Sequence, residues 1–159
     1  MSKQEIEAPK GISLKSFNRV SACSQIYDMP VLDEYGEPMI VGGVKDENDK
    51  VVGGVPVILQ IIGEAAKEVQ DFEFAQHDKE ERRKWLAGKK GDKDADKPVA
   101  LAVHAENSVE KACLLVKGWK GIDAEFNHEN LFYLMENNPD LRADVFKNAR
   151  DTRNFLLKL

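Results

Sequence analysis

The sequence contains few of the residues from which metal centres and disulfide frameworks are built. Only 2 cysteines and 3 histidines occur among its 159 residues. Cys23 and Cys113 are far apart and neither has a second cysteine nearby, so we expect two free thiols in a reducing cytoplasm. His77, His104 and His128 are also isolated, which favours surface or locally hydrogen-bonded histidines over a metal site.

Long apolar runs and an excess of positive charge are missing as well. No stretch is long enough to span a bilayer, and the segment from Met1 to Lys10 has no apolar run, so we expect neither a membrane anchor nor a signal peptide. The formal net charge of -5 argues against duplex DNA or another nucleic acid as the main partner, because phosphate neutralisation requires a local excess of Lys and Arg. With 42% apolar and 32% charged residues, we expect a soluble globular protein.

Signals for catalysis or for a bound cofactor are equally scarce. Gly42-Gly43 and Gly53-Gly54 are not followed by a lysine and a serine or threonine, so they indicate turns or bulges rather than a phosphate-binding loop. The acids between residues 78 and 96 alternate with lysines and arginines, as in a solvated charged face. We therefore predict no catalytic residue, no cofactor and no metal, and we interpret the chain as a protein that is not an enzyme.

The first half of the chain has short β-type runs separated by turn residues. The sequence predicts a small antiparallel meander from the runs Ile26 to Leu32, Met39 to Val44 and Val51 to Val52. The apolar segment from Pro56 to Ile62 predicts a strand buried on both faces or the last strand before a helix. Residues 11–24 have no dominant period and are interpreted as an arm or a short helix.

A long helix and a linker follow. Apolar residues at helical spacing predict a helix from about Glu64 into the eighties, with Gly88 as its end and a Glu80 to Lys84 pair on its charged outer half. The segment 88–98, GKKGDKDADKP, has two glycines, a proline and alternating charge, which predicts a linker.

The last third of the chain is expected to be helical. An apolar stripe predicts a helix from about Val99 to Gly118, Asn127 is placed to cap a second helix, and Asn138 with Pro139 is placed to start a third that runs nearly to the end. We expect an α+β protein with a small N-terminal antiparallel β element and a mainly helical C-terminal part. Its divisions are 1–87 for the β element and charged helix, 88–98 for the linker, and 99–159 for a three-helix unit.

A particular order of residues runs through this last third: a helix that ends on tryptophan, a phenylalanine shortly after it, a Glu-Asn step and a proline that opens the terminal helix. The residues in this order are Val116, Trp119-Lys120-Gly121-Ile122, Phe126, Glu129-Asn130, Leu134, Pro139, Leu141 and Asn154-Phe155-Leu156. The order resembles the C-terminal half of the phage tail assembly chaperone families of long-tailed phages. The resemblance implies a protein of the host cell cytoplasm that binds the tape-measure protein and recruits tail-tube subunits to it.

Two alternatives stay open beside this interpretation. The β element and the linker depart from the family pattern, so the chain could instead be a structural protein of the virion, in the tail or neck. A phage-encoded inhibitor or regulator of a host protein is a further alternative, since acidic phage proteins can mimic nucleic acid. The mixed signs of the charge runs count against that last class.

The terminal helix is the predicted protein-binding surface. It places Leu141, Val145, Ala149 and Leu156 on one side and Phe146 and Phe155 beside them, which is more apolar surface than a three-helix unit needs. We therefore expect Phe146 and Phe155 to bind another protein or to form a homo-oligomer. Trp119 and Phe126 are further candidates, although a tryptophan at a helix end more often closes a local core.

Overall fold

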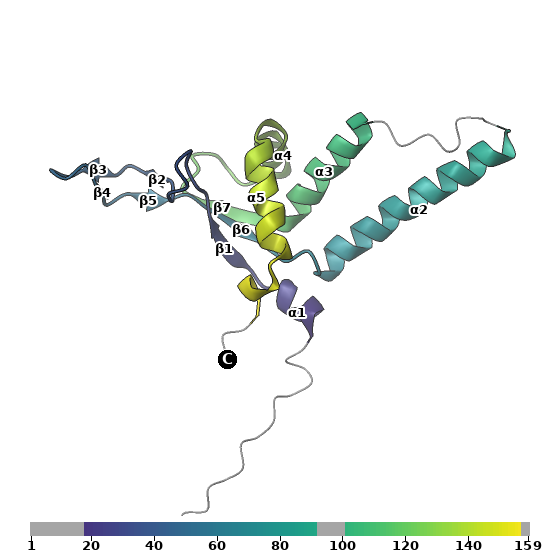
Figure 1. Ribbon diagram of the computed structural model, residues 1–159, viewed down its shortest axis with the longest axis horizontal. Helices are drawn as coiled ribbons and strands as arrows, with labels where there is room; N and C mark the ends of the chain where they lie inside the picture. The colour runs from purple at the N-terminus through teal and green to yellow at the C-terminus, as the bar shows by residue number, and fades with distance from the viewer. Residues whose placement is uncertain (1–17, 92–100, 157–159) are drawn as a thin grey trace, which may run out of the picture.

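The computed structural model describes residues 18–91 and 101–156 and confirms the α+β class, with small antiparallel strands in the N-terminal part and mainly helices after them (Figure 1). In chain order the elements are α1 (Arg19–Cys23), β1 (Tyr27–Pro30), β2 (Ile40–Val41), β3 (Val44–Lys45), β4 (Val51–Val52), β5 (Val55–Pro56), β6 (Ile58–Ile61), α2 (Lys67–Lys89), α3 (Leu101–Leu115), β7 (Val116–Lys120), α4 (His128–Asn137), α5 (Pro139–Arg150) and the 3-10 turn η2 (Thr152–Asn154).

The strand predicted from the apolar segment at 56–62 is the middle of the main sheet. β6 pairs antiparallel with β1 on one side, where Tyr27 lies opposite Ile61, and antiparallel with β7 on the other, where Ile61 lies opposite Val116. Leu59 and Ile61 are fully buried on one face, whereas Ile58 and Gln60 on the other face are only half-buried. The strand is thus covered completely on a single face, and it is also the last strand before α2.

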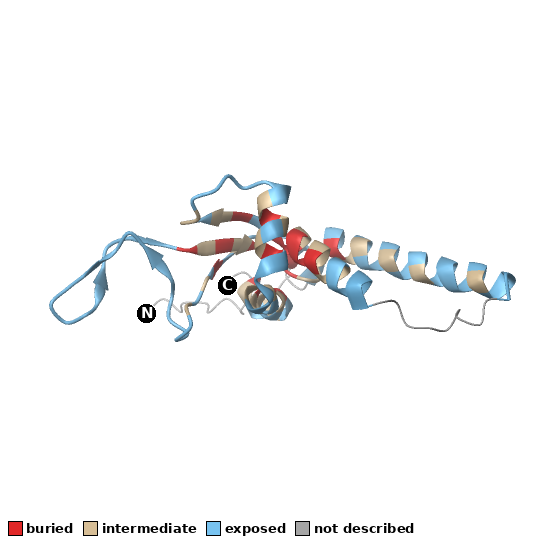
Figure 2. Cartoon of the chain, turned by 90° about the horizontal axis from the view of Figure 1, so that it is seen from above, coloured by how far each residue is buried: buried red, intermediate tan, exposed pale blue. Residues whose placement is uncertain are grey.

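A single apolar core joins the sheet to the helices. Figure 2 shows the buried residues gathered where the strands meet the helices. Fully buried members come from each of these elements, namely Leu59 and Ile61 of β6, Val69 of α2, Leu115 of α3, Met135 of α4 and Val145 of α5. Because β1 and β6 precede the predicted linker and β7 follows it, both parts of the chain contribute to this one sheet and core.

The predicted helix from 99 to 118 is wrong at its C-terminal end. α3 ends at Leu115, and the next residue begins β7, in which Val116 is buried and Lys117 is exposed. Val116 lies three residues after Cys113, so it continues the apolar stripe of the helix although it belongs to a strand. Residues 99 and 100 lie outside the described part of the chain.

The first long helix differs from its prediction at both ends. α2 begins at Lys67 rather than Glu64, because Ala66 has an extended backbone, and it continues through Gly88 to Lys89. The predicted pair on its outer half is confirmed, with Lys84 Nζ 3.5 Å from a Glu80 carboxylate oxygen. Of the predicted linker, residues 92–98 lie outside the described residues.

The starts of the last two helices follow the sequence, but the end of the chain does not. The Asn127 side chain accepts a hydrogen bond from the Asn130 amide at 2.8 Å, which confirms it as the cap of α4. Asn138 precedes α5 as expected, yet its amide group donates to the Leu134 carbonyl instead of capping α5. The prediction that the last helix runs nearly to the end is wrong, because α5 stops at Arg150 and Asp151 has an extended backbone.

The strands between β1 and β6 form a projecting arm and not the predicted meander. β2 pairs with β5 and β3 pairs with β4, so that two short ribbons are nested within one long hairpin (Figure 1). A separate turn precedes the arm, in which the Asp33 carboxylate accepts from the Tyr35 and Glu37 amides. At the tip, Asp46 accepts from the Asn48 and Lys50 amides in the same way. We call residues 39–57 the β arm.

Candidate protein interface

The thiols and imidazoles are not assembled into a reactive group. Within residues 18–91 and 101–156, no three His, Cys, Asp or Glu side chains lie together in a way that could hold a metal ion. Cys23 and Cys113 are free and buried, and burial raises the pKa of both thiols. For Cys113, burial and then the Glu110 charge raise the pKa to about 11, so this thiol is protonated at neutral pH.

No helix in the described ranges is long and apolar enough to cross a membrane. The three histidines lie on the exposed surfaces of different helices, His77 on α2, His104 on α3 and His128 at the start of α4.

Trp119 and Phe126 lie together and close the loop between β7 and α4. Their rings meet edge to face, with centroids 5.0 Å apart and an interplanar angle of 86°. The indole Nε1 of Trp119 donates to the Ala124 carbonyl at 2.9 Å. Trp119 is half-buried and Phe126 is 38% exposed, so the pair stabilises this loop and only the Phe126 ring has an appreciable free surface.

Phe155 does not lie on the surface, where the sequence placed it. It is 3% exposed and its ring packs edge to face on Tyr27 of β1, with centroids 6.0 Å apart. Because the helix ends at Arg150, residues beyond it no longer follow helical spacing, so Phe155 enters the core while Leu156 is 46% exposed. The predicted binding ring at position 155 is therefore a core residue.

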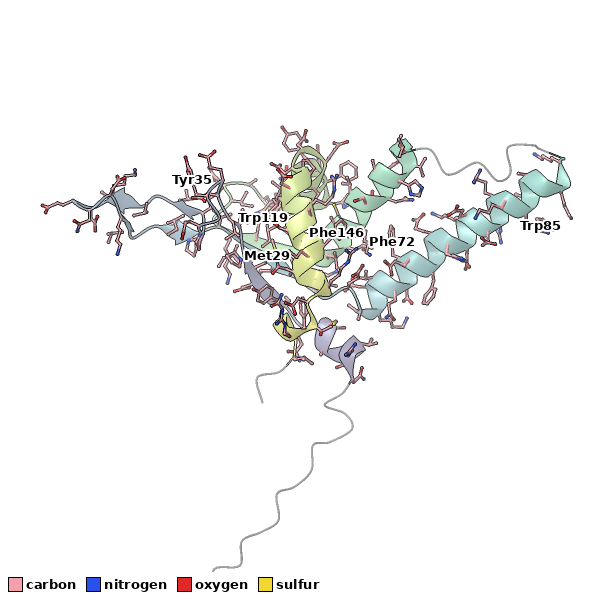
Figure 3. All side chains as sticks on the ribbon, viewed as in Figure 1. Met29, Tyr35, Phe72, Trp85, Trp119 and Phe146 are labelled. Carbon is pink, nitrogen blue, oxygen red and sulfur yellow. The ribbon has the colours of Figure 1, made fainter. Side chains whose placement is uncertain are left out.

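Phe146 lies on α5 and is half-buried, facing an open hollow of about 400 Å³ between α2 and α3. Phe72 of α2 and His104 and Ser108 of α3 line the same hollow, and Figure 3 shows Phe72 and Phe146 on its two sides. Of the two rings predicted on the last helix, Phe146 is thus the one that a partner could reach.

An ion-pair cluster forms one wall of this hollow and ties three helices together. The Lys111 ammonium on α3 donates to Glu64 and to Glu73, and Arg150 of α5 donates to the other Glu64 oxygen at 3.0 Å. Burial alone would lower the pKa of Lys111, but its two glutamate partners raise it above the ordinary value. Burial alone would raise the pKa of Glu64, but Lys111 and Arg150 lower it. These charges satisfy one another, so the cluster is a structural tie.

The β arm carries the largest run of exposed apolar side chains. Its exposed members are Met39, Ile40, Val41, Val44, Val51, Val52 and Val55. Neighbouring residues of a strand point to opposite faces, so Ile40 and Val41 place apolar groups on both faces of the arm. Val44, opposite Val52 near the tip, is 74% exposed. In the described part of the chain each ribbon has two strands, so every strand of the arm has one unpaired edge.

Glycines allow the two ribbons of the arm to join. Gly54 has φ +87, and a Cβ at this position would lie 2.7 Å from the Gly43 nitrogen and 2.8 Å from the Val41 carbonyl oxygen. The interpretation of the paired glycines as turns or bulges is confirmed, since they lie between β2 and β3 and between β4 and β5.

α2 also carries exposed apolar side chains, one in its first half and two near its C-terminal end. Phe74, Trp85 and Leu86 are 69%, 58% and 45% exposed, and Lys89 Nζ lies 4.0 Å from the centroid of the Trp85 ring. Figure 1 shows α2 extending away from the sheet and diverging from α3.

Sequence reasoning does not identify either of these surfaces. The valines of the arm indicate strands without showing that they are exposed, and the aromatic residues of α2 are hidden within a charged run. The sequence does contain one signal for the exposed arm. Its β-branched residues lie between two pairs of glycines, and too few apolar segments lie near them in the sequence to cover them. Comparisons of the chain with models of known protein families, with curated proteins and with solved structures find no match.

Proposed function

We propose that this protein is a phage tail assembly chaperone, which binds tape-measure and tail-tube proteins in the host cell cytoplasm and uses the β arm as its main contact. The observation that carries the proposal is the arm, whose apolar side chains lie on both faces and whose strands have unpaired edges. The resemblance in the last third of the chain supports tail proteins as the class of partner.

An isolated two-stranded ribbon is marginally stable in water, so the arm gains most from a partner that adds a strand. Such a strand would satisfy the unpaired backbone edge, and its side chains would cover the valines. Fully burying one valine side chain contributes about 1.5–3 kcal/mol, so several such contacts together offset part of the cost of association. An extended segment of a tail-tube or tape-measure protein has the chemistry that this surface requires.

The proposal is tested by affinity capture, in which the full chain is used to bind the tape-measure and tail-tube proteins of the same phage. We expect capture by the wild type and at least about tenfold weaker binding by the double variant Val44→Thr with Val52→Thr, which removes apolar surface but keeps the β-branched shape. A double variant outside the arm, Tyr133→Gln with Leu156→Gln, removes two exposed apolar side chains and should bind as the wild type does. Failure of the wild type to bind either tail protein would contradict the proposed function. Equal binding by the arm variant and the wild type would show that the arm is not the contact surface.

A structural protein of the virion is the second candidate, favoured by the β arm because the arm lies outside the part of the chain that resembles the chaperones. An arm of this kind could equally join subunits of a finished tail. Mass spectrometry of purified particles separates the two functions. A chaperone leaves the assembled tail, so its absence supports the first proposal, whereas a stoichiometric amount in the particles identifies a structural component.

A further inference from the structure

The outer face of α2 has a regular seam of exposed residues. The inner face of the helix, with Val69 buried and Phe72, Gln76 and Glu80 half-buried, lies toward the rest of the protein. On the opposite side, exposed residues recur at alternating spacings of four and three, which is the repeat of a coiled-coil seam. We call these residues the α2 seam: Asp71, Ala75, Asp78, Arg82, Trp85 and Lys89.

Charge is distributed unevenly along this helix. Residues 67–77 contain three acids and one lysine, a net charge of -2, whereas residues 78–90 contain six bases and three acids, a net charge of +3. Two copies of α2 placed side by side in parallel would bring like charges together. Placed antiparallel, the acidic half of each copy lies against the basic half of the other.

We propose that two copies of this protein associate through an antiparallel pairing of their α2 seams. In one register, every layer of the seam is complementary. Asp71 lies opposite Lys89 of the second copy, Asp78 lies opposite Arg82, and Ala75 lies opposite Trp85. Two-fold symmetry repeats each contact, so one surface patch forms four ion pairs and two contacts between Trp85 and Ala75.

The layer of Ala75 and Trp85, next to the central layer, has shape complementarity where the other two layers have charge complementarity. Ala75, Asp78, Lys79 and Arg82 are spaced as the four residues of a hole in knobs-into-holes packing, and they line a hollow beside α2. The small Ala75 side chain leaves room above it, and the 58% exposed ring of Trp85 is the large residue that reaches this place from the second copy. Tryptophan is among the residues that most often dominate interface energies.

The seam is accessible for this pairing. All six of its residues are exposed, and Asp71, which pairs with Lys67 at 2.6 Å, keeps 60% of its side chain accessible to Lys89 of a second copy. The overlap from residue 71 to residue 89 is about 27 Å of helix, so the contact is at the small end of specific interfaces. We therefore expect a dimer with a dissociation constant in roughly the micromolar range, weakened by salt.

Sedimentation of the full chain from about 1 µM to about 1 mM tests this pairing, with charge reversals at its central layer. Asp78→Arg brings two arginine side chains together in both halves of the dimer, and Arg82→Asp brings two aspartate side chains together there. Each variant alone should have a dissociation constant raised at least about tenfold. Mixed in equal amounts, the two variants should form a heterodimer of nearly wild-type affinity, because the two central arginines of one chain then face the two central aspartates of the other.

The control reverses a charge elsewhere, with Glu136→Arg on α4, and should sediment as the wild type does. Circular dichroism checks that each variant keeps its helix content. A wild type that stays monomeric at the highest concentration overturns the proposal. So does a wild-type dimer that persists in Asp78→Arg, or a mixture of the two reversed variants that fails to associate, since the pairing requires both the repulsion and its rescue.

Discussion

Phe155 and Phe126 show how little a residue type says about its role. Both are phenylalanines of the last third of the chain, yet one is 3% exposed in the core and the other is 38% exposed on a loop. Phe155 contacts Tyr27 of the first strand, whereas Phe126 contacts Trp119. Phe155 enters the core because α5 ends at Arg150 and Asp151 has an extended backbone, and the spacing of apolar residues alone does not predict this end.

Truncation of these two rings should therefore have unequal effects on stability. Phe155→Ala removes a buried ring and leaves a cavity beside Tyr27, so we expect the free energy of unfolding to fall by about 3–5 kcal/mol. Phe126→Ala removes a partly exposed ring and should have a clearly smaller effect. Urea unfolding of the two variants measures the difference. Equal losses of stability would contradict the assignment of Phe155 to the core.

Cys113 should make the stability depend on pH in the alkaline range. Burial and the Glu110 charge raise its pKa from the ordinary 9.0 to about 11 in the folded protein. The unfolded chain therefore loses the thiol proton first, so the stability is complete below pH 9 and falls as the pH rises toward 11. In Cys113→Ala this part of the decline should be absent. Urea unfolding across that range compares the two slopes, and identical slopes would mean that the thiol does not titrate as described.

At the scale of elements, the tie between α2, α3 and α5 rests on Lys111. Its replacement by methionine would leave the Glu64 carboxylate with Arg150 alone and Glu73 without this partner. A half-buried hydrogen-bonded charge contributes about 1–3 kcal/mol, so Lys111→Met should lower the free energy of unfolding by an amount of that order at neutral pH.

Acid should reproduce part of this effect in the wild type. The pKa of Glu64 is lowered from its ordinary 4.5, so its contribution is present above that value and is lost as the pH falls through the lower pKa of the folded state. Lys111→Met should show a smaller loss of stability in this acid range. Thermal melts of the wild type and of Lys111→Met between neutral and acid pH measure this difference. An unchanged acid sensitivity in the variant would contradict the stabilising role of the Lys111 cluster.

A substitution at Gly88 tests whether this residue belongs to α2 or to the linker predicted from the sequence. A Cβ at this position meets nothing within 4 Å, and the helix continues to Lys89. Gly88→Ala should therefore stabilise the last turn of α2, by up to about 0.5–1 kcal/mol, and raise the helix content measured by circular dichroism. A loss of helix content would place Gly88 outside the helix, as the sequence alone predicts.

The elements that local sequence signals could predict are the ones whose cause is local. Asn127 caps α4 through its own side chain, Pro139 opens α5, and the apolar run at 56–62 forms the central strand. β7 escapes prediction because Val116 fits the helical stripe, and only its pairing with β6 makes it a strand. The pairing within the arm could not be predicted for a related reason. β2 pairs with β5, and turn residues alone do not determine which strands pair.

At the scale of the whole molecule, one core carries two projections of different kinds. Figures 1 and 2 show the β arm and α2 leaving the core on opposite sides, both largely exposed. The binding surface expected on the terminal helix is reduced to Phe146, because Phe155 is buried. The apolar residues of the arm can be read from the sequence, but their exposure cannot. Exposure depends on how much of the rest of the chain packs over them, which composition does not determine.

Hydrogen exchange of the complex tests most directly whether the β arm binds a tail protein, as we propose. The chain is measured alone and with an equimolar tail-tube or tape-measure protein from the same phage. Addition of a strand should slow exchange at least about tenfold at the arm amides on unpaired edges, in β2 to β5, while α4 exchanges as before. Unchanged exchange throughout the arm, with protection of α5 around Phe146 instead, would contradict the account.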